Sequence, residues 1–204
     1  MKYLAIDTSG DLVVILFDGE KYYTEYLKGC NTKHSLTLMP YVEQCLINSG
    51  LKLEDLDFLS VVTGPGSFTG IRIGIATIKA LAFATGKKIM PLTSFQVLAY
   101  TDNAPDKACL LVDANHDNYY VGIFDDKKQV MPPCFMNIGE IDKLLGERVA
   151  VCERVIDGLK GESMIADRVS GIKNAILNNA SELVSSNEVY PLYVKKSQEE
   201  EELC

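Results

Sequence analysis

Short apolar runs alternate with turn residues at the start of the chain. Residues 3–6 and 12–17 are rich in branched and aromatic side chains, which predicts two strands. The polar stretch 7–10 between them (Asp-Thr-Ser-Gly) predicts a turn. Asp18-Gly19 is a two-residue hairpin signal, and residues 22–27 predict a third strand. This part of the chain therefore predicts a three-stranded meander.

The pattern then changes to helical spacing between residues 35 and 48. The apolar positions, three and four residues apart, are Leu38, Met39, Val42, Cys45 and Leu46. Pro40 is tolerated if it lies in the first turn, where its missing N–H would be unpaired anyway. Ser49-Gly50 predicts the end of this helix.

A strand, a glycine-rich loop and a second helix come next. Residues 58–62 predict a short buried strand, and residues 63–70 form a loop with three glycines and a proline. Residues 71–84 predict a helix that Gly86 ends. Its apolar face consists of Ile71, Ile75, Ile78 and Ala82. The predicted order is three strands, helix, strand, helix.

A second unit begins near residue 108. Residues 109–112 and 119–124 predict strands joined by a polar turn, and Val130-Met131 predicts a third. Weaker helix and strand signals lie at residues 139–145, 149–151, 155–159 and 170–179. We therefore divide the chain into an N-terminal lobe (1–104), a smaller C-terminal lobe (105–194) and a charged, solvated tail (195–204).

The two units share a weak internal echo. Leu4-Ala5-Ile6-Asp7 and Leu110-Leu111-Val112-Asp113 each end a strand in aspartate before a polar turn and a second strand. Two similar lobes would produce this pattern, and so would chance, because a strand followed by aspartate and a turn is common.

Composition and charge narrow the class of protein. The 204 residues are 47% hydrophobic and 24% charged, typical of a soluble globular protein. No apolar run approaches the roughly 20 residues of a membrane span, and the N-terminus lacks signal-peptide features, so we expect a cytoplasmic protein without membrane contact. With 20 Lys and Arg against 28 Asp and Glu, the net charge of −8 argues against strong nucleic-acid binding by this chain alone.

Cysteine and histidine usage bears on metal and redox sites. The six cysteines include no Cys-x-x-Cys pair, which argues against a zinc ribbon and favours free, mostly buried thiols. His34 and His116 are the two histidines, and their spacing excludes a His-x-x-x-His metal pair. We therefore predict no metal site.

Two segments could carry chemistry. The turn at residues 7–10 could hold a phosphate through backbone N–H groups and place Asp7 near a metal, or it could be a plain hairpin turn. The loop at 64–70 runs into a helix N-terminus, which suits an anion, but it matches neither a Walker A loop nor Gly-x-Gly-x-x-Gly. Arg72 could meet an anion there or be solvated.

Small residues form a stripe along the second helix. Gly70, Gly74 and Thr77 share one side of it, which allows another helix to approach closely. That contact could lie within the chain or between subunits.

Several motifs together resemble the TsaB (YeaZ) family. They are Asp7-Thr8-Ser9, Lys33-His34-Ser35 with Leu38 and Pro40, the run Gly64-Pro65-Gly66-Ser67-Phe68-Thr69-Gly70-Ile71-Arg72-Ile73-Gly74, Leu81-Ala82 and Thr93-Ser94-Phe95. The resemblance is close over residues 1–100, looser through Asp113-Ala114 and Tyr119-Tyr120, and returns at residues 191–197. It implies the α/β actin-like ATPase (ASKHA, ribonuclease H-like) fold, with two lobes that each contain a mixed sheet and helices.

The resemblance also implies a role. TsaB-like proteins pair with a catalytic relative, TsaD, which transfers a threonylcarbamoyl group from an adenylate made by TsaC to adenosine 37 of tRNA, and the ATPase TsaE joins them. The chain is then expected to be a non-catalytic scaffold and activating subunit rather than an enzyme, to reach tRNA through the complex, and to form a homodimer when alone.

The resemblance places the partner interface on the two helices of the first lobe. The side chains expected there are His34, Leu38, Met39, Val42, Gly70, Arg72, Ile73, Gly74, Thr77 and Leu81. The degenerate phosphate loop is Asp7, Thr8, Ser9 and Gly10, and the motif loop is Gly64, Pro65, Gly66, Ser67, Phe68 and Thr69. In this interpretation the small-residue stripe serves an intersubunit helical bundle.

Departures from active members of the fold argue against independent catalysis. The second lobe is short, residues 113–115 (Asp-Ala-Asn) lack the glycine of an active phosphate loop, and no adenosine-seating glycine pair lies near residues 151–154. No intrinsic cofactor is expected, and weak nucleotide binding at a subunit junction is left open. The alternatives are a stand-alone ATPase or phosphotransferase using Asp7 and Ser9, and a metallopeptidase, which the missing histidine pair disfavours.

Overall fold

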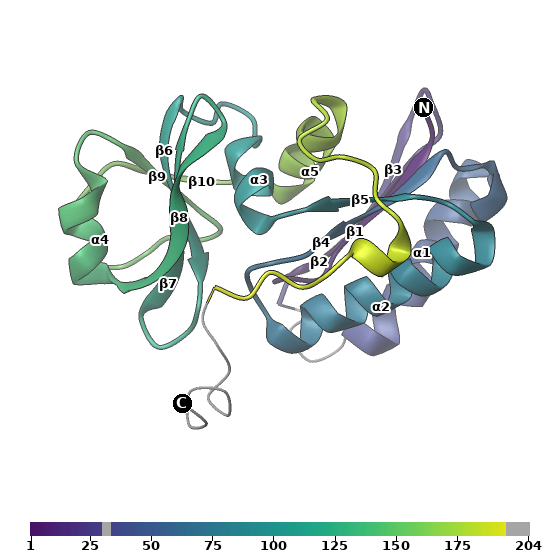
Figure 1. Ribbon diagram of the computed structural model, residues 1–204, viewed down its shortest axis with the longest axis horizontal. Coiled ribbons are helices and arrows are strands. Elements are labelled where there is room, and N and C mark those ends of the chain that lie inside the picture. Colours follow the sequence, from purple (N-terminus) through teal and green to yellow (C-terminus); the bar gives the residue numbers. More distant parts are fainter. Residues whose placement is uncertain (30–33, 195–204) are drawn as a thin grey trace.

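The computed structural model of the protein describes residues 1–29 and 34–194. They form two lobes, each built on a five-stranded mixed sheet (Figure 1). The predicted two-lobed α/β architecture is confirmed.

The first sheet has the strand order β3-β2-β1-β4-β5. Its strands are β1 (Tyr3–Asp7), β2 (Leu12–Phe17), β3 (Tyr22–Leu27), β4 (Phe58–Val62) and β5 (Ile89–Leu92). β1 pairs antiparallel with β2 and parallel with β4, so it lies at the centre of the sheet. The predicted meander is confirmed, and β5 is an addition to the prediction.

The tight hairpin predicted between β2 and β3 is present one residue later than its Asp18-Gly19 signal, because the Asp18 N–H donates to the Lys21 carbonyl (3.1 Å) and leaves Gly19 and Glu20 at the tip. Phe17 pairs with Tyr22, so the loop spans residues 18–21. The Asp18 carboxylate accepts hydrogen bonds from the N–H groups of Glu20 (2.8 Å) and Lys21 (2.7 Å). This side chain stabilises the tight turn.

Two helices cover one face of the first sheet, α1 (His34–Ser49) and α2 (Phe68–Thr85) (Figure 1). Their apolar stripes pack into one core with side chains of β1, β2 and β4. The members from the helices are Leu38, Val42, Cys45, Ile71, Ile75, Ile78 and Ala82. α2 starts at Phe68, before the predicted Ile71, because the Ser67 side chain caps the Gly70 N–H (3.2 Å).

Pro40 lies in the second turn of α1, not the first, so that expectation is wrong. The helix begins one residue earlier than the apolar pattern indicates. Gly50 and Gly86 have φ of 69° and 68°, the left-handed conformation that ends each helix, as predicted.

The opposite face of the first sheet packs against α3 (Ser94–Ala99) and α5 (Arg168–Leu177). α3 is too short to show helical periodicity, and a capping box between Thr93 and Gln96 starts it. Its other side contacts the second sheet through Phe95 and Leu98. α3 therefore packs against both lobes.

The second sheet repeats the first with the strand order β10-β9-β6-β7-β8. Its strands are β6 (Lys107–Asp113), β7 (Asn118–Asp125), β8 (Lys128–Asn137), β9 (Val149–Cys152) and β10 (Ser163–Ile165), and α4 (Ile138–Leu145) covers its outer face. β6 pairs antiparallel with β7 and parallel with β9, as β1 does with β2 and β4. This correspondence supports duplication over chance as the source of the sequence echo.

Two parts of the second unit differ from the prediction. Residues 155–159 form neither a helix nor a strand, and β10 has no counterpart among the predicted elements. The remaining short elements are the 3-10 helices η1 (Leu53–Asp55) and η2 (Ser186–Glu188).

The chain returns to the first lobe after β10. Ile172 and Ile176 of α5 pack on the first sheet, and Val184 bridges to Ile89 of β5. The Leu192 N–H donates to the Thr63 carbonyl (2.8 Å). The sequence-based boundary at residue 104 separates the two sheets, but residues 168–192 contact the first lobe.

The described cysteines are free thiols, as predicted. Cys45, Cys109 and Cys152 are buried and Cys134 is half-buried. Burial raises the pKa of Cys45 to about 11 and that of Cys109 to about 12. Cys30 and Cys204 lie outside the described residues.

The apolar character of α2 differs from the expectation that no run approaches the length of a membrane span. Among the described helices, α2 is long and apolar enough to do so by length and composition. One side of it packs against the first sheet through Ile71, Ile75 and Ile78. The same composition is found in core helices of proteins that do not cross membranes.

Candidate functional site

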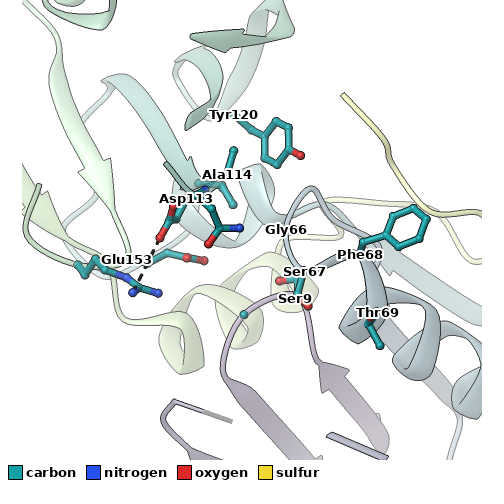
Figure 2. A pocket seen from close by; sticks show the side chains of 13 residues that line it. Ser9, Gly66, Ser67, Phe68, Thr69, Asp113, Ala114, Tyr120 and Glu153 are labelled. Atoms are coloured by element: carbon teal, nitrogen blue, oxygen red, sulfur yellow. Dashed lines mark hydrogen bonds and ion pairs between the residues drawn. The ribbon is translucent and has the colours of Figure 1, made fainter. Parts of the chain in front are cut away.

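Two similar turns face a cavity between the lobes. Asp7 Oδ1 accepts from the N–H (2.9 Å) and Oγ (2.7 Å) of Ser9, and Asp113 Oδ1 accepts from the Asn115 N–H (2.7 Å). The cavity has a volume of about 410 Å³ (Figure 2). Its lining comprises Ser9, Gly10, Gly66, Ser67, Phe68, Thr69, Val112, Asp113, Ala114, Asn115, Tyr120, Glu153 and Arg154.

The structure brings the predicted phosphate loop and motif loop together. The Ser67 N–H donates to the Ser9 carbonyl (2.6 Å), and Thr8 Oγ1 donates to the Gly70 carbonyl (2.7 Å). On the other side of the turn, His34 Nε2 lies 3.0 Å from the Gly10 carbonyl. The turn at residues 7–10 is therefore fixed by α1, α2 and the loop before α2.

The glycines of the motif loop allow this close approach. A Cβ on Gly66 would lie 2.3 Å from the Ser9 carbonyl oxygen, and one on Gly70 would lie 2.0 Å from that of Thr8. Gly64 has a φ of 109°, which side chains other than glycine rarely adopt. The glycines thus let two backbone segments touch.

Asp7 is fully buried and bound to Arg168. Its Oδ2 accepts from Arg168 Nε (2.7 Å) and Nη2, and Arg168 Nη2 also donates to Ser9 Oγ (2.7 Å). Arg168 Nη1 contacts Glu153 Oε1. One guanidinium therefore bridges two carboxylates.

Burial shifts the ionisation of this cluster. It raises the pKa of Glu153, an effect that Arg168 opposes. Burial would lower the pKa of Arg168, but Asp7 and Glu153 outweigh it and the net shift is upward. The Arg168 cation is thus stabilised by its two partners.

Neither Arg168 nor Glu153 was among the predicted site residues. The sequence gives no signal for them, because the predicted helical stretch starts at residue 170, two residues after Arg168.

The described residues do not fit the metal-bound nucleotide that an actin-like fold implies. Both oxygens of Asp7 already accept hydrogen bonds, from Ser9 and Arg168. Both carboxylate oxygens of Glu153 lie 3.8 Å from where a Cβ of Gly10 would be, so a negative charge lies beside Gly10 of the turn. Within residues 1–29 and 34–194, no three His, Cys, Asp or Glu side chains are grouped to hold a metal ion.

Comparison with known proteins shows the family. A model of the family described as TsaD: tRNA N6-adenosine threonylcarbamoyltransferase matches residues 28–201. The tRNA threonylcarbamoyladenosine biosynthesis protein TsaB of Bacillus subtilis (strain 168) is 30% identical over 154 residues, which cover 72% of this chain and 67% of that protein. The chain belongs to the TsaB family.

Other relatives agree. TsaB of Haemophilus influenzae is 28% identical over 165 residues, covering 78% of this chain and 68% of that protein. The solved structure of YeaZ from Pseudomonas aeruginosa superposes with a TM-score of 0.74 at 21% identity, covering 94% of this chain and 99% of that one. The resemblance to the TsaB family and its actin-like fold is confirmed.

Half of the interface side chains predicted for this TsaB-family chain are buried within it. His34, Leu38, Val42, Gly70 and Gly74 are buried and contribute to the interior of the chain, and their assignment as partner contacts stays a prediction. Gly70 and Gly74 face Thr8, which makes their part of the small-residue stripe an internal contact.

The remaining predicted residues lie nearer the surface. Met39 and Arg72 are exposed, whereas Ile73, Thr77 and Leu81 are half-buried. Arg72 is neither free in solvent nor aimed at an anion, because its guanidinium lies 3.7 Å from the Phe68 ring centroid and its Nε donates to Tyr193 Oη (2.9 Å). It links α2 to the C-terminal segment.

Large apolar side chains that the prediction omitted lie on the outer faces of the same two helices. In α1, Leu36 is 75% exposed and Ile47 is 66% exposed. In α2, Phe83 is 87% exposed. The outer face of each helix of this TsaB-family chain therefore exposes large apolar side chains among polar ones.

The buried His34 predicts a pH dependence of stability. Burial lowers the pKa of His34 below its ordinary value near 6.5, so the unfolded chain binds this proton more readily than the folded chain. The free energy of unfolding should fall as pH decreases from 7 through the window just below 6.5, by at most about 1.4 kcal/mol per pH unit. His34→Gln keeps a donor for the Gly10 carbonyl and should lose this component.

Chemical denaturation of the wild type and of His34→Gln at several pH values measures this component of the free energy of unfolding. The difference between them isolates His34, because the carboxyl groups are common to both. Parallel pH profiles would contradict the assignment.

Proposed function

We propose that the chain is the non-catalytic, activating subunit of a tRNA N6-threonylcarbamoyladenosine modification complex. It pairs with a catalytic TsaD-like subunit, and a TsaE-like ATPase joins the pair. Curated relatives of the same family are named as tRNA threonylcarbamoyladenosine biosynthesis proteins, which supports the pathway. Such a role places the chain in the cytoplasm, where tRNA is modified.

The large apolar side chains exposed on α1 and α2 are the observation that carries the docking part of the proposal. Leu36, Met39 and Ile47 of α1 and Phe83 of α2 expose large apolar surfaces on two helices that cover one sheet face. Exposed apolar patches of this kind are typical of protein interfaces. In the isolated chain the same exposed side chains would support a homodimer.

The cleft supports the non-catalytic part of the proposal. The Asp7 carboxylate, the candidate metal ligand of an ATPase, is buried and bound to Arg168. His34, one of the two histidines, is buried against Gly10. No observation favours a stand-alone ATPase or a metallopeptidase.

The net charge supports the view that another subunit holds the tRNA. At −8, the chain has an unfavourable overall charge for a polyphosphate partner. The activating role is thus exerted on the protein partner and not on the RNA.

Substitution of Phe83 tests the docking face. Phe83→Asp puts a charge on a side chain that is 87% exposed, so the chain should fold normally and lose the complex. A buried interface charge without a partner should weaken binding by at least about tenfold. Light scattering on the chain mixed with the TsaD-like protein of the same genome measures complex formation.

Val155→Asp is the matched control. Val155 is 72% exposed and follows β9 in the second lobe, away from α1 and α2 in the sequence and in the sheets. This variant should form the complex as the wild type does. Normal complex formation by Phe83→Asp, or equal loss in both variants, would contradict docking through α2.

A further inference from the structure

The Asp7–Arg168–Glu153 cluster joins three segments that are far apart in the chain. Asp7 ends β1, Glu153 follows β9, and Arg168 begins α5. The side chain of Asp7 is 0% exposed, that of Glu153 is 14% exposed and that of Arg168 is 4% exposed. Burying such a charged cluster costs free energy of desolvation unless every member is paired, so its arrangement is specific.

Two of the three members belong to the first lobe. Arg168 starts the helix that packs on the first sheet through Ile172 and Ile176, and it binds Asp7 and Ser9 of the β1–β2 turn. These contacts would persist if the second lobe moved.

Glu153 is the member from the second lobe. It continues from β9, the strand that pairs with β6 at the centre of the second sheet. Its carboxylate contacts Arg168 and lies beside Gly10 of the turn. Among the described ion pairs, the Arg168–Glu153 pair connects the first lobe to the second. The Arg154–Asp113 and Arg148–Asp125 pairs both lie within the second lobe.

We infer that this cluster, the interlobe clasp, replaces a metal-bound phosphate and holds the lobes closed without a ligand. In a two-lobed nucleotide cleft, a cation lies between an aspartate of the turn and the anionic phosphate. Here the Arg168 guanidinium lies between the Asp7 carboxylate and the Glu153 carboxylate, which lies beside the turn. In both arrangements a cation lies between two anions, and here side chains of the protein supply all three charges.

The clasp also sets the position of the second lobe relative to α2. The turn beside Glu153 is bonded to the start of α2 through the Thr8–Gly70 and Ser67–Ser9 hydrogen bonds. Closure of the lobes and the geometry of this helix are therefore fixed together. The inference is independent of the proposed role in tRNA modification, since it concerns the chain alone.

Glu153→Ala tests the clasp without leaving an unpaired buried charge, because Arg168 stays bound to Asp7 and Ser9. Small-angle scattering of the variant should show a larger radius of gyration than that of the wild type. Hydrogen exchange of the backbone amides at residues 8–11 should be at least about tenfold faster, since the Glu153 carboxylate that lies beside Gly10 and pairs with Arg168 is lost. The amides of β1 and β4 should keep their exchange rates, which shows that the fold is intact.

Arg154→Ala is the matched control, because Arg154 neighbours Glu153, lines the same cavity and pairs within the second lobe. It should leave both measurements unchanged. In the wild type, millimolar Mg-ATP should also leave exchange at residues 8–11 unchanged.

Three results would overturn the inference. The first is a radius of gyration and amide exchange rates in Glu153→Ala that equal those of the wild type. The second is an equal effect of Arg154→Ala, which would indicate a general loss of charge at the cavity. The third is protection of the turn by Mg-ATP in the wild type, which would show that the positions of the metal and the phosphate are free.

Discussion

Arg168→Met is expected to lower the free energy of unfolding by about 3–5 kcal/mol. The substitution keeps an unbranched apolar stem but leaves the carboxylates of Asp7 and Glu153 buried next to each other without their cation. This loss is a large part of the 5–15 kcal/mol that typically separates folded from unfolded domains. Because the chain contains no tryptophan, urea unfolding is best followed by circular dichroism.

Two comparisons isolate the charge effect. Arg154→Met makes the same change at a guanidinium that is 66% exposed, and it should cost less than about 1 kcal/mol. Combining Arg168→Met with Asp7→Asn and Glu153→Gln removes all three charges, so the triple variant should be more stable than Arg168→Met alone. If the single variant matched the wild type, the cluster would not be the buried, paired unit described above.

Gly70→Ala is expected to destabilise the chain by about 3 kcal/mol, the upper end of the range for overpacking. The added methyl group would lie 2.0 Å from the Thr8 carbonyl oxygen, a backbone atom that cannot rotate away. Either the turn at residues 7–10 or the start of α2 must shift. The better helix propensity of alanine, worth up to about 1 kcal/mol, does not offset this clash.

Gly139→Ala in α4 is the matched control for helix propensity. The nearest atom to its added methyl group is Asn137 Oδ1 at 3.4 Å, and the position lies in a helix. No loss of stability is expected there. Equal stability of Gly70→Ala and Gly139→Ala in urea unfolding would show that the turn tolerates displacement, which contradicts its role as a fixed element.

Much of the fold follows from local pattern. β1, β2 and the core stripes of α1 and α2 were predictable because strand and helix periodicities are strong over these lengths. The echo around Asp7 and Asp113 also indicated two related sheets, which the matching strand orders support. β5, α3 and β10 are three to six residues long, so they are too short to show a period.

The site was less predictable, for two physical reasons. The partner of Asp7 lies 161 residues away, and no spacing rule connects Asp7 to Arg168. The family resemblance indicates which two helices form the interface, but it does not distinguish their outer residues from the apolar stripe that packs in the core. Leu38 and Val42 are therefore buried, while the residues available to a partner, such as Phe83, lie off that stripe.

The central claim is that this chain activates a TsaD-like enzyme by binding it. The most direct test is tRNA modification reconstituted from the TsaC-, TsaD- and TsaE-like proteins of the same genome, with and without the chain, and read as N6-threonylcarbamoyladenosine in digested tRNA. The account predicts that modification requires the wild-type chain, that Val155→Asp replaces it, and that Phe83→Asp does not. Modification at the same rate without the chain would contradict the account.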